Sequence, residues 1–339
     1  MRTIKATVLL LALVATARAQ EFKYRVTDLG ALPGGNSSAA YAINNRGQVT
    51  GESDVASQGP FYTEQHAFLY SNGQMQDLGV LGGQYSYGMG INDHGVVVGN
   101  STTTSDDSYF IYPFIWSGGA MRNIGSLGGI VGGANAINDQ GIVVGSSDMR
   151  TGEERAFIYN GTMHDLGTGN GSEATDINNL NQVVGTVSQS TSESSTLVFL
   201  WQNGYTRILP TLGGSRSFGP HINDLGFVVG TSTLAGDKVE HAFGYAFGRI
   251  LDLSPGAAFS EASAINLYSQ VVGSYSVDGI SEHAFVWHYP ARLQDLNTLI
   301  DPMSGWVLIK ASSENDLGQI VGEGIHSGLN RAFLLTPYY

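Results

Sequence analysis

Ionisable side chains at matching distances from a recurring asparagine are the first residues in this chain that could do chemistry. They occupy the position five residues before that asparagine, or a position close to it, and they are Glu173, Asp176, His221, Glu261, Lys310 and Glu314. Two carboxyl groups across a cleft can cleave glycosides or uronides, with one acting as the acid and the other as the base. The alternative, which we favour, is that these groups line a wet channel without a catalytic role, because charges at a solvated mouth cost little.

Two long insertions carry aromatic residues that could contact a ligand. The insertions span residues 54–65 and 102–112, and they include Tyr62 and Tyr109. Aromatic rings of this kind can stack on sugar rings or pack against a protein partner. Ordinary loop packing is the alternative, since loops vary freely in length and sequence.

The stretch INDHGVVVG, residues 91–99, resembles part of a metal-binding loop. Asn92 and Asp93 could be calcium ligands, but a calcium loop needs several oxygen atoms that converge on one ion. No further carboxylate follows them at a fixed spacing in the related stretches. We therefore interpret the motif as a hairpin turn in which Asn or Asp bonds its own backbone and glycine takes the left-handed position. The chain contains no P-loop, dinucleotide fingerprint, HExxH motif or nucleophile elbow, so we predict neither a metal nor a cofactor.

The same motif recurs seven times along the chain, and we number the copies one to seven. The recurring asparagines are Asn44, Asn92, Asn138, Asn178, Asn223, Asn266 and Asn315. Seven residues after each of them stands a glycine: Gly51, Gly99, Gly145, Gly185, Gly230, Gly273 and Gly322. Each copy then reaches a phenylalanine: Phe68, Phe114, Phe157, Phe199, Phe243, Phe285 and Phe333.

Each copy is typical of four short antiparallel strands. The first strand precedes the asparagine and the second follows the turn. The third strand resembles HAFLY (66–70) and turns through a pair such as Asn72-Gly73 into a fourth strand of the MQDLG type (75–79). Four strands every 40–50 residues predict an all-β fold, a seven-bladed β-propeller formed by the single domain 20–339. The chain begins with a lone fourth strand at 24–30, which we expect to pair with the last copy and close the ring.

The first strand of each copy is expected to lie nearest the axis. Four residues before each asparagine the residue is always alanine or glycine, at Ala40, Gly88, Ala134, Ala174, Gly219, Ala262 and Ala311. Inner strands approach one another most closely, so larger side chains would clash there. One residue before the asparagine stands isoleucine in six copies and Glu314 in the seventh.

The N-terminus and the composition predict an exported protein. Residues 1–19 have a basic start, an apolar run and a small-x-small cleavage site, which is the pattern of a signal peptide. Removing them takes away Arg2, Lys5 and Arg18, which leaves 13 of the 16 basic residues against 29 acidic ones, a net charge of −16. This charge argues against nucleic acid as a partner, and no later segment is apolar enough to predict a membrane span. The chain has no cysteine, so packing must stabilise it without disulfides.

The repeats resemble those of the bacterial HAF-repeat family of extracellular proteins. The residues that carry the resemblance are His66-Ala67-Phe68, His241-Ala242-Phe243 and His283-Ala284-Phe285, with the variants Arg155-Ala156-Phe157 and Arg331-Ala332-Phe333. The segment 295–308 is similar to the terminal repeat of the family. The resemblance, which covers about residues 22–337, implies export and a repeat architecture but no defined activity. The histidines belong to separate copies and cannot converge on one metal ion.

Three functions remain open at the level of the sequence. The leading hypothesis is a secreted, monomeric, non-catalytic protein that binds a glycan or an extracellular protein. The second hypothesis is a carbohydrate-active enzyme, a lyase or glycosidase, with acidic residues at the channel mouth. The third is a structural component of the extracellular matrix or envelope. The expected location is extracellular, with the periplasm as the alternative.

Overall fold

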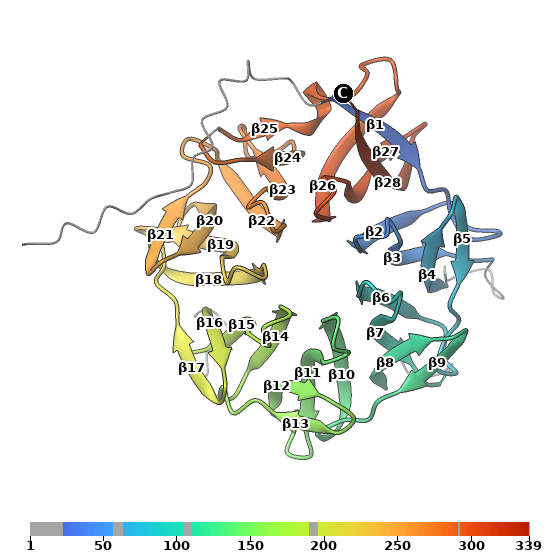
Figure 1. Cartoon of the computed structure of the whole chain (residues 1–339), viewed down its shortest axis with the longest axis vertical. Coiled ribbons are helices and arrows are strands. Elements are labelled where there is room, and N and C mark those ends of the chain that lie inside the picture. The colour runs from blue at the N-terminus through green and yellow to red at the C-terminus, as the bar shows by residue number, and fades with distance from the viewer. Residues whose placement is uncertain (1–22, 57–63, 105–109, 190–195, 291, 339) are drawn as a thin grey trace, which may run out of the picture.

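The computed structural model describes residues 23–56, 64–104, 110–189, 196–290 and 292–338. The described residues form 28 strands, β1 to β28, and a single turn of 3-10 helix, η1 (Leu296–Thr298). The strands are arranged around a central axis, with one strand of each group near the axis and the others following outwards (Figure 1). The expected signal peptide, Tyr62 and Tyr109 lie outside the described residues. In the part of the chain described, no helix is long and apolar enough to cross a membrane.

The strands of copies one to three form one four-stranded and one eight-stranded sheet. The first contains β2 (Ser38–Ile43), β3 (Val49–Asp54), β4 (Gln65–Ser71) and β5 (Gln74–Asp77). The second contains β6 (Ser86–Ile91), β7 (Val97–Thr102), β8 (Ile111–Ser117), β9 (Ala120–Asn123), β10 (Gly128–Ile137), β11 (Val143–Met149), β12 (Glu154–Tyr159) and β13 (Met163–Asp165). The eight-stranded sheet is two four-stranded groups, since a single parallel pair, Val131 with Ile111, joins β10 to β8.

The strands of copies four to seven form four-stranded sheets. Copy four contains β14 (Ser172–Ile177), β15 (Val183–Ser188), β16 (Thr196–Gln202) and β17 (Tyr205–Ile208). Copy five contains β18 (Gly213–Ile222), β19 (Val228–Leu234), β20 (Glu240–Ala246) and β21 (Arg249–Asp252). Copy six contains β22 (Phe259–Ile265), β23 (Val271–Ser276), β24 (His283–Trp287) and β25 (Gln294–Asp295). Copy seven contains β26 (Trp306–Glu314), β27 (Ile320–His326) and β28 (Leu329–Tyr338), and β1 (Lys23–Asp28) is its fourth strand.

The strand at the beginning of the chain pairs with the strand at its end, as the sequence predicts. β1 runs antiparallel to β28 in a register from Lys23 opposite Tyr338 to Asp28 opposite Phe333. The first and last strands therefore share one sheet, beside β2 in Figure 1. Ala332 in β28 also donates its backbone N–H to the Ser38 hydroxyl in β2, at 3.0 Å.

The small residues of the innermost strands are explained by close backbone contact. In copy three, Ala134 in β10 is fully buried and pairs with Gly145 in β11. A β-carbon added to Gly145 would overlap the carbonyl oxygen of Gly133 and approach the Ala134 Cα to 2.9 Å. The recurring glycine is therefore needed because the inner hairpin leaves no room for a side chain.

The recurring phenylalanines form the core between neighbouring copies. All seven are fully buried, and their clusters mix residues of adjacent copies. Phe199 of copy four, for example, packs with Val144 and Ala156 of copy three. Apolar burial thus joins each sheet to the previous one instead of stabilising each copy alone.

Candidate functional site

The turns that follow the innermost strands meet around the axis on one face, which we call the turn face. In each turn the recurring asparagine accepts two backbone N–H groups with its Oδ1 atom, as Asn92 does from His94 and Val96 at 3.1 and 3.0 Å. Its Nδ2 atom donates to the backbone carbonyl of the asparagine in the next copy. These distances, from the Asn44–Asn92 pair onward to Asn315–Asn44, are 2.9, 3.1, 3.2, 3.0, 2.9, 3.3 and 3.0 Å. We call this set of contacts the asparagine ring.

The interpretation of INDHG as a turn is confirmed, but it was incomplete. The last turn residue has positive φ in every copy, including Asn181 (φ 59°) and Ser269 (φ 60°), which stand where the other copies have glycine. Turn formation alone does not require asparagine at the first position, since aspartate would cap the same N–H groups. Only the amide has a donor for the neighbouring copy. The signal that sequence reasoning missed is that this position is asparagine seven times and never aspartate.

A second set of polar residues follows the asparagine ring, and its members stand directly after the ring asparagines. They are Asn45, Asp93, Asp139, Asn179, Asp224, Leu267 and Asp316. Most accept the preceding copy's backbone N–H, as Asp139 does from Asp93 at 2.9 Å. The side-chain amide of Asn45 lies between Asp93 and Asp316, at 3.1 and 3.2 Å from their Oδ2 atoms. Asn179 lies in the same way between Asp139 and Asp224.

These turns enclose a central cavity of about 230 Å³. Each copy contributes three consecutive residues to its lining, which are Ile, Asn and Asn or Asp in most copies. In copy seven the first of the three is Glu314. The sequence-predicted candidate Glu314 therefore lies at this cavity, and the other five sequence-predicted residues described here do not line it.

Glu314 is buried without a hydrogen bond of good geometry. It is 8% exposed, and neither carboxyl oxygen meets the distance and angle of a hydrogen bond among the described residues. Burial raises the pKa of its carboxyl group well above the ordinary value, and the nearby negative charge of Asp316 raises it further. The backbone N–H of Asn266, which donates to the Gln270 carbonyl at 3.1 Å, lies near enough to lower the pKa of Glu314 slightly. An unpaired buried carboxyl group is costly to keep.

The structure brings two pairs of sequence-predicted residues together elsewhere in the channel. The Lys310 ammonium lies 2.6 Å from a carboxylate oxygen of Glu261. His221 Nδ1 lies 3.6 Å from Asp176 Oδ2, and the same oxygen accepts the backbone N–H of Ile222 at 3.0 Å. These carboxylates are held by neighbouring groups, which favours a structural role over an acid–base role.

Glu173 is also held by a neighbouring copy. The Asn135 amide of copy three donates to Glu173 Oε1 at 2.8 Å and to the Ala174 carbonyl at 2.9 Å. Burial raises the pKa of the Glu173 carboxyl group, and the hydrogen bond from Asn135 partly offsets this shift. The carboxyl group therefore connects copies three and four.

Sequence reasoning missed a cluster of glutamate and tyrosine side chains on the same side of the channel as Lys310. Glu323 is the register partner of Lys310, and Glu52 hydrogen-bonds Tyr41. Burial raises the pKa of both Glu52 and Tyr41, and the nearby charge of Glu323 adds to each shift. The sequence signal lies on the second strand, where these two copies have glutamate and the others have Ser, Thr or Asn.

A groove on the turn face lies between copies four and five and has a volume of about 620 Å³. Tyr205 and Phe247 line it and are 83% and 84% exposed. Its polar lining comes from the side chains of Gln182, Gln202, Asn203 and Arg207. The Arg207 guanidinium lies 5.4 Å from the ring centre of Tyr245, another lining residue. Amphipathic rings beside amide and guanidinium donors are typical of a ligand-binding groove.

A second surface cavity, of about 500 Å³, lies between copies five and six. Its lining includes Tyr275, Trp287 and Arg292. Tyr275 and Trp287 are partly buried, and Tyr275 packs edge-on against Phe285 with ring centres 6.3 Å apart. These rings belong to the core more than to the surface, so the first groove is the stronger candidate.

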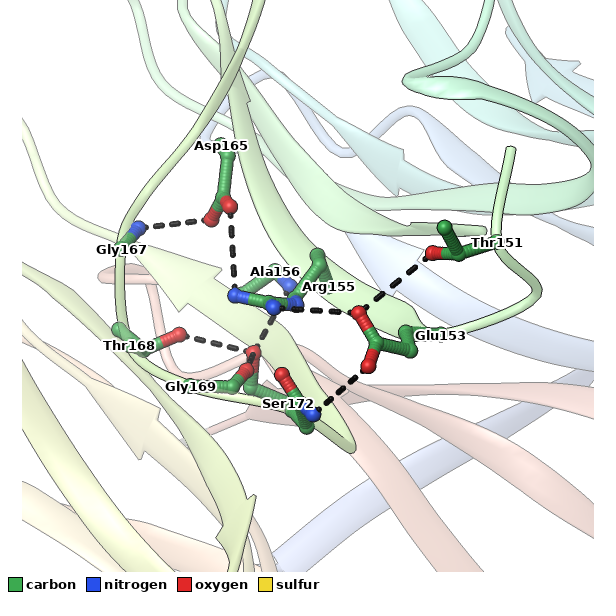
Figure 2. A network of polar contacts seen from close by, with 10 residues as sticks. Thr151, Glu153, Arg155, Ala156, Asp165, Gly167, Thr168, Gly169 and Ser172 are labelled. Atoms are coloured by element: carbon green, nitrogen blue, oxygen red, sulfur yellow. Dashed lines mark hydrogen bonds and ion pairs between the residues drawn. The ribbon is translucent and has the colours of Figure 1, made fainter. Parts of the chain in front are cut away.

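The HAF histidines join the third and fourth strands within one copy. His66, His241 and His283 place Nδ1 2.9, 2.8 and 2.6 Å from Asp77, Asp252 and Asp295. Figure 2 shows the variant in copy three, where Arg155 lies between Asp165 and Glu153, at 3.5 and 3.4 Å. Among the residues with described positions, no group of three or more His, Asp or Glu side chains could hold a metal ion.

Known proteins share the fold of this chain but not its sequence. No family model matches it, and no curated protein matches it. The β-propeller domain of the Trilobed protease from Pyrococcus furiosus is similar over 89% of this chain and 93% of that domain, with a TM-score of 0.62 and 8% identity. An acylaminoacyl peptidase from Pyrococcus horikoshii has a TM-score of 0.57 and 8% identity, over 91% of this chain and 52% of that one. A puromycin-hydrolyzing peptidase from Mycobacterium tuberculosis also has a TM-score of 0.57, at 11% identity, over 93% of this chain and 51% of that one. At these identities the similarity shows the fold, an all-β propeller, and leaves the activity open.

Proposed function

We propose that this protein is a secreted, non-catalytic binding protein that recognises a glycan through the groove between copies four and five. The proposal rests mainly on Phe247. It is an aromatic residue exposed to solvent and held at a positive φ of 52° in the turn between β20 and β21. A bulky residue in this conformation is strained, and strain of this kind gathers at functional sites.

The equivalent turns of other copies show which residue types ordinarily hold this positive-φ position. Asn72 and Asn203 hold it in copies one and four, and Gly118 holds it in copy two, also at positive φ. Asparagine accepts this conformation more readily than phenylalanine does. The Phe247 ring contacts Phe227 edge-on, with ring centres 5.2 Å apart, and the rest of its surface is exposed and available to a ligand.

The chemistry of the groove fits a sugar chain. Tyr205 and Phe247 offer flat apolar faces of the kind that pack against sugar rings. The amide groups of Gln202 and Asn203 and the guanidinium of Arg207 can exchange hydrogen bonds with hydroxyl groups.

The enzymatic alternative has weaker support. Glu173, Asp176 and Glu261 are each bound to a group of a neighbouring strand, and they do not line the central cavity. A purely structural role accounts for the edge-on contact of Phe247 with Phe227 but leaves the large exposed surface of Phe247 and Tyr205 unexplained. Both alternatives are outcomes of the experiment below.

We further propose that the molecule is a monomeric, seven-bladed propeller of HAF-type repeats, closed by β1 and exported by the segment 1–19. The pairing of β1 with β28 and the asparagine ring support closure. The seven recurring motifs support the blade count, and the three-part N-terminal pattern supports export.

The direct test is to screen residues 20–339 against a panel of polysaccharides while recording binding and product release together. We expect binding without release of fragments. Phe247→Asn should weaken the binding at least tenfold. It relieves the strained turn but removes the edge-on contact with Phe227, and because these effects oppose each other the stability should change by less than about 1 kcal/mol. Loss of binding with little change of stability separates a ligand contact from a folding defect.

Gly118→Asn is the matched control, because it changes the equivalent turn of copy two, outside the groove, and should leave binding intact. Release of fragments that stops in Glu173→Gln or Glu261→Gln would establish the enzyme instead. Binding that Phe247→Asn leaves unchanged, or no binding to any polysaccharide, would overturn the glycan groove.

A further inference from the structure

The central cavity of the turn face carries negative charge without a compensating cation. Its lining, all within the described residues, contains no Lys, Arg or His side chain. The carboxyl groups in the lining belong to Asp93, Asp139, Asp224, Asp316 and Glu314. Fixed carboxylates around a concave site raise the local concentration of cations.

Glu314 is the independent sign that this cavity has a ligand. It stands where six copies have isoleucine, and isoleucine fills that position without any polar group to satisfy. The residue is only 8% exposed, and neither oxygen atom accepts a hydrogen bond of good geometry among the described residues. The nearby backbone N–H of Asn266 is already bonded to the Gln270 carbonyl. Buried hydrogen-bond acceptors normally have a donor as partner. A bound ligand that carries a donor group could supply the partner that Glu314 lacks.

The arrangement of the carboxylates favours an organic cation over a metal ion. Calcium needs six to eight oxygen ligands close together. Here the amide of Asn45 separates Asp93 from Asp316, and the amide of Asn179 separates Asp139 from Asp224. The charges are thus spread around the mouth, while a single carboxyl group lies among isoleucines behind them.

We propose that the central cavity of the turn face binds one organic cation, an alkylammonium or guanidinium group, with Glu314 as its carboxyl partner. The cavity volume of 230 Å³ exceeds several times the roughly 30 Å³ that one water molecule occupies in the liquid. A lysine or arginine head group of a partner, or a free amine, has room to enter. The asparagine ring holds the backbone of the lining in place. The Glu314 oxygens are closed to solvent, so its carboxyl group has to turn toward the cation that enters.

The test uses methylammonium chloride as the probe and residues 20–339 as the protein, at constant ionic strength. Binding is measured by calorimetry and by the methyl resonances of labelled isoleucines. Methylammonium should shift the resonances of Ile43 and Ile265, which belong to the copies on either side of Glu314, and should leave Ile280, outside the cavity lining, unshifted. Glu314→Ile should weaken the binding at least tenfold, and Glu261→Gln, outside the lining, should not change it.

Three results would overturn the proposal. If methylammonium shows no saturable binding to the protein, the cavity is not a site for organic cations. Equal binding by the parent protein and Glu314→Ile would show that the aspartates alone attract the probe. Calcium chloride that binds tighter than methylammonium and loses its binding in Glu314→Ile would assign the cavity to a metal ion.

Discussion

At the scale of single residues, the chemistry of this protein comes from a few positions of the repeat. Comparing the seven copies shows which positions keep one residue type and which depart from it. The ring asparagine serves two copies at once, by capping its own turn and donating to the next. Glu314 departs from the pattern, since it places a carboxyl group where the other six copies have an isoleucine side chain. The first kind of residue stabilises the ring, and the second costs stability.

Glu314→Ile should stabilise the protein at neutral pH when no cation is added. Leaving a buried polar group unsatisfied costs about 1–3 kcal/mol, and the variant removes that cost. The pKa of Glu314 is raised in the folded chain, so the free energy of unfolding of the parent falls as the pH rises above 4.5. Urea unfolding at several pH values should show a smaller fall in the variant. A variant that is less stable at every pH would contradict this assignment.

Asn223→Ala should destabilise the protein by about 2–4 kcal/mol, because it removes three hydrogen bonds of a buried side chain. The lost donor connects copy five to the Asn266 carbonyl of copy six at 2.9 Å. Leu225→Ala, an exposed change in the same turn, is the control and should stay within about 0.5 kcal/mol of the parent. Similar stabilities for the two variants would mean that the asparagine ring contributes little to the free energy of unfolding.

At the scale of strands and turns, close packing of the inner hairpin dominates. The glycine of the second strand faces the backbone of the first, which no side chain can penetrate. The phenylalanine of the third strand fills the space beside the previous copy. Each element is therefore specified by its contacts with a neighbour as much as by its own propensity.

Gly145→Ala and Gly133→Ala should differ sharply although they lie in the same hairpin. A β-carbon on Gly145 would overlap the Gly133 carbonyl oxygen, and relieving this overlap should cost about 1–3 kcal/mol or more. A β-carbon on Gly133 would meet only the flexible amide of Asn100, at 3.1 Å, so that change should cost less than about 1 kcal/mol. Thermal unfolding of both variants measures the two losses of stability. Equal losses would contradict the close approach of Gly145 to the Gly133 carbonyl group.

The fold could be predicted from the sequence because the repeats reveal strand order, turn positions and buried faces. Ala134, Phe157 and Gly145 were placed correctly for this reason. The candidate sites could be predicted only in part. Glu314 stood out as a departure from isoleucine, but the partners of Glu173 and Asp176 lie in neighbouring copies, and no sequence spacing reveals them. Phe247 was missed because its meaning depends on backbone conformation and exposure, which a sequence pattern does not show.

At the scale of the whole molecule, the turn face is the product of all copies together. The cavity takes residues from each of them, and the groove lies directly outside it, since Asp224 lines the cavity and the next residue, Leu225, lines the groove. The cavity requires copies one and seven to stay together, whereas the groove takes its lining from copies four and five. The contacts that hold the junction of copies one and seven include the pairing of β1 with β28, the Asn315–Asn44 hydrogen bond and the Ala332–Ser38 hydrogen bond.

The measurement that tests this architecture most directly is thermal unfolding of residues 31–339 beside residues 20–339. Deletion of β1 exposes the edge of β28 and removes the buried ring of Tyr24 from the core of copy seven. We predict a large fall in the unfolding midpoint, and partial recovery when a peptide of residues 22–30 is added. An unchanged midpoint would contradict closure by β1, and with it the complete turn face on which the central cavity depends.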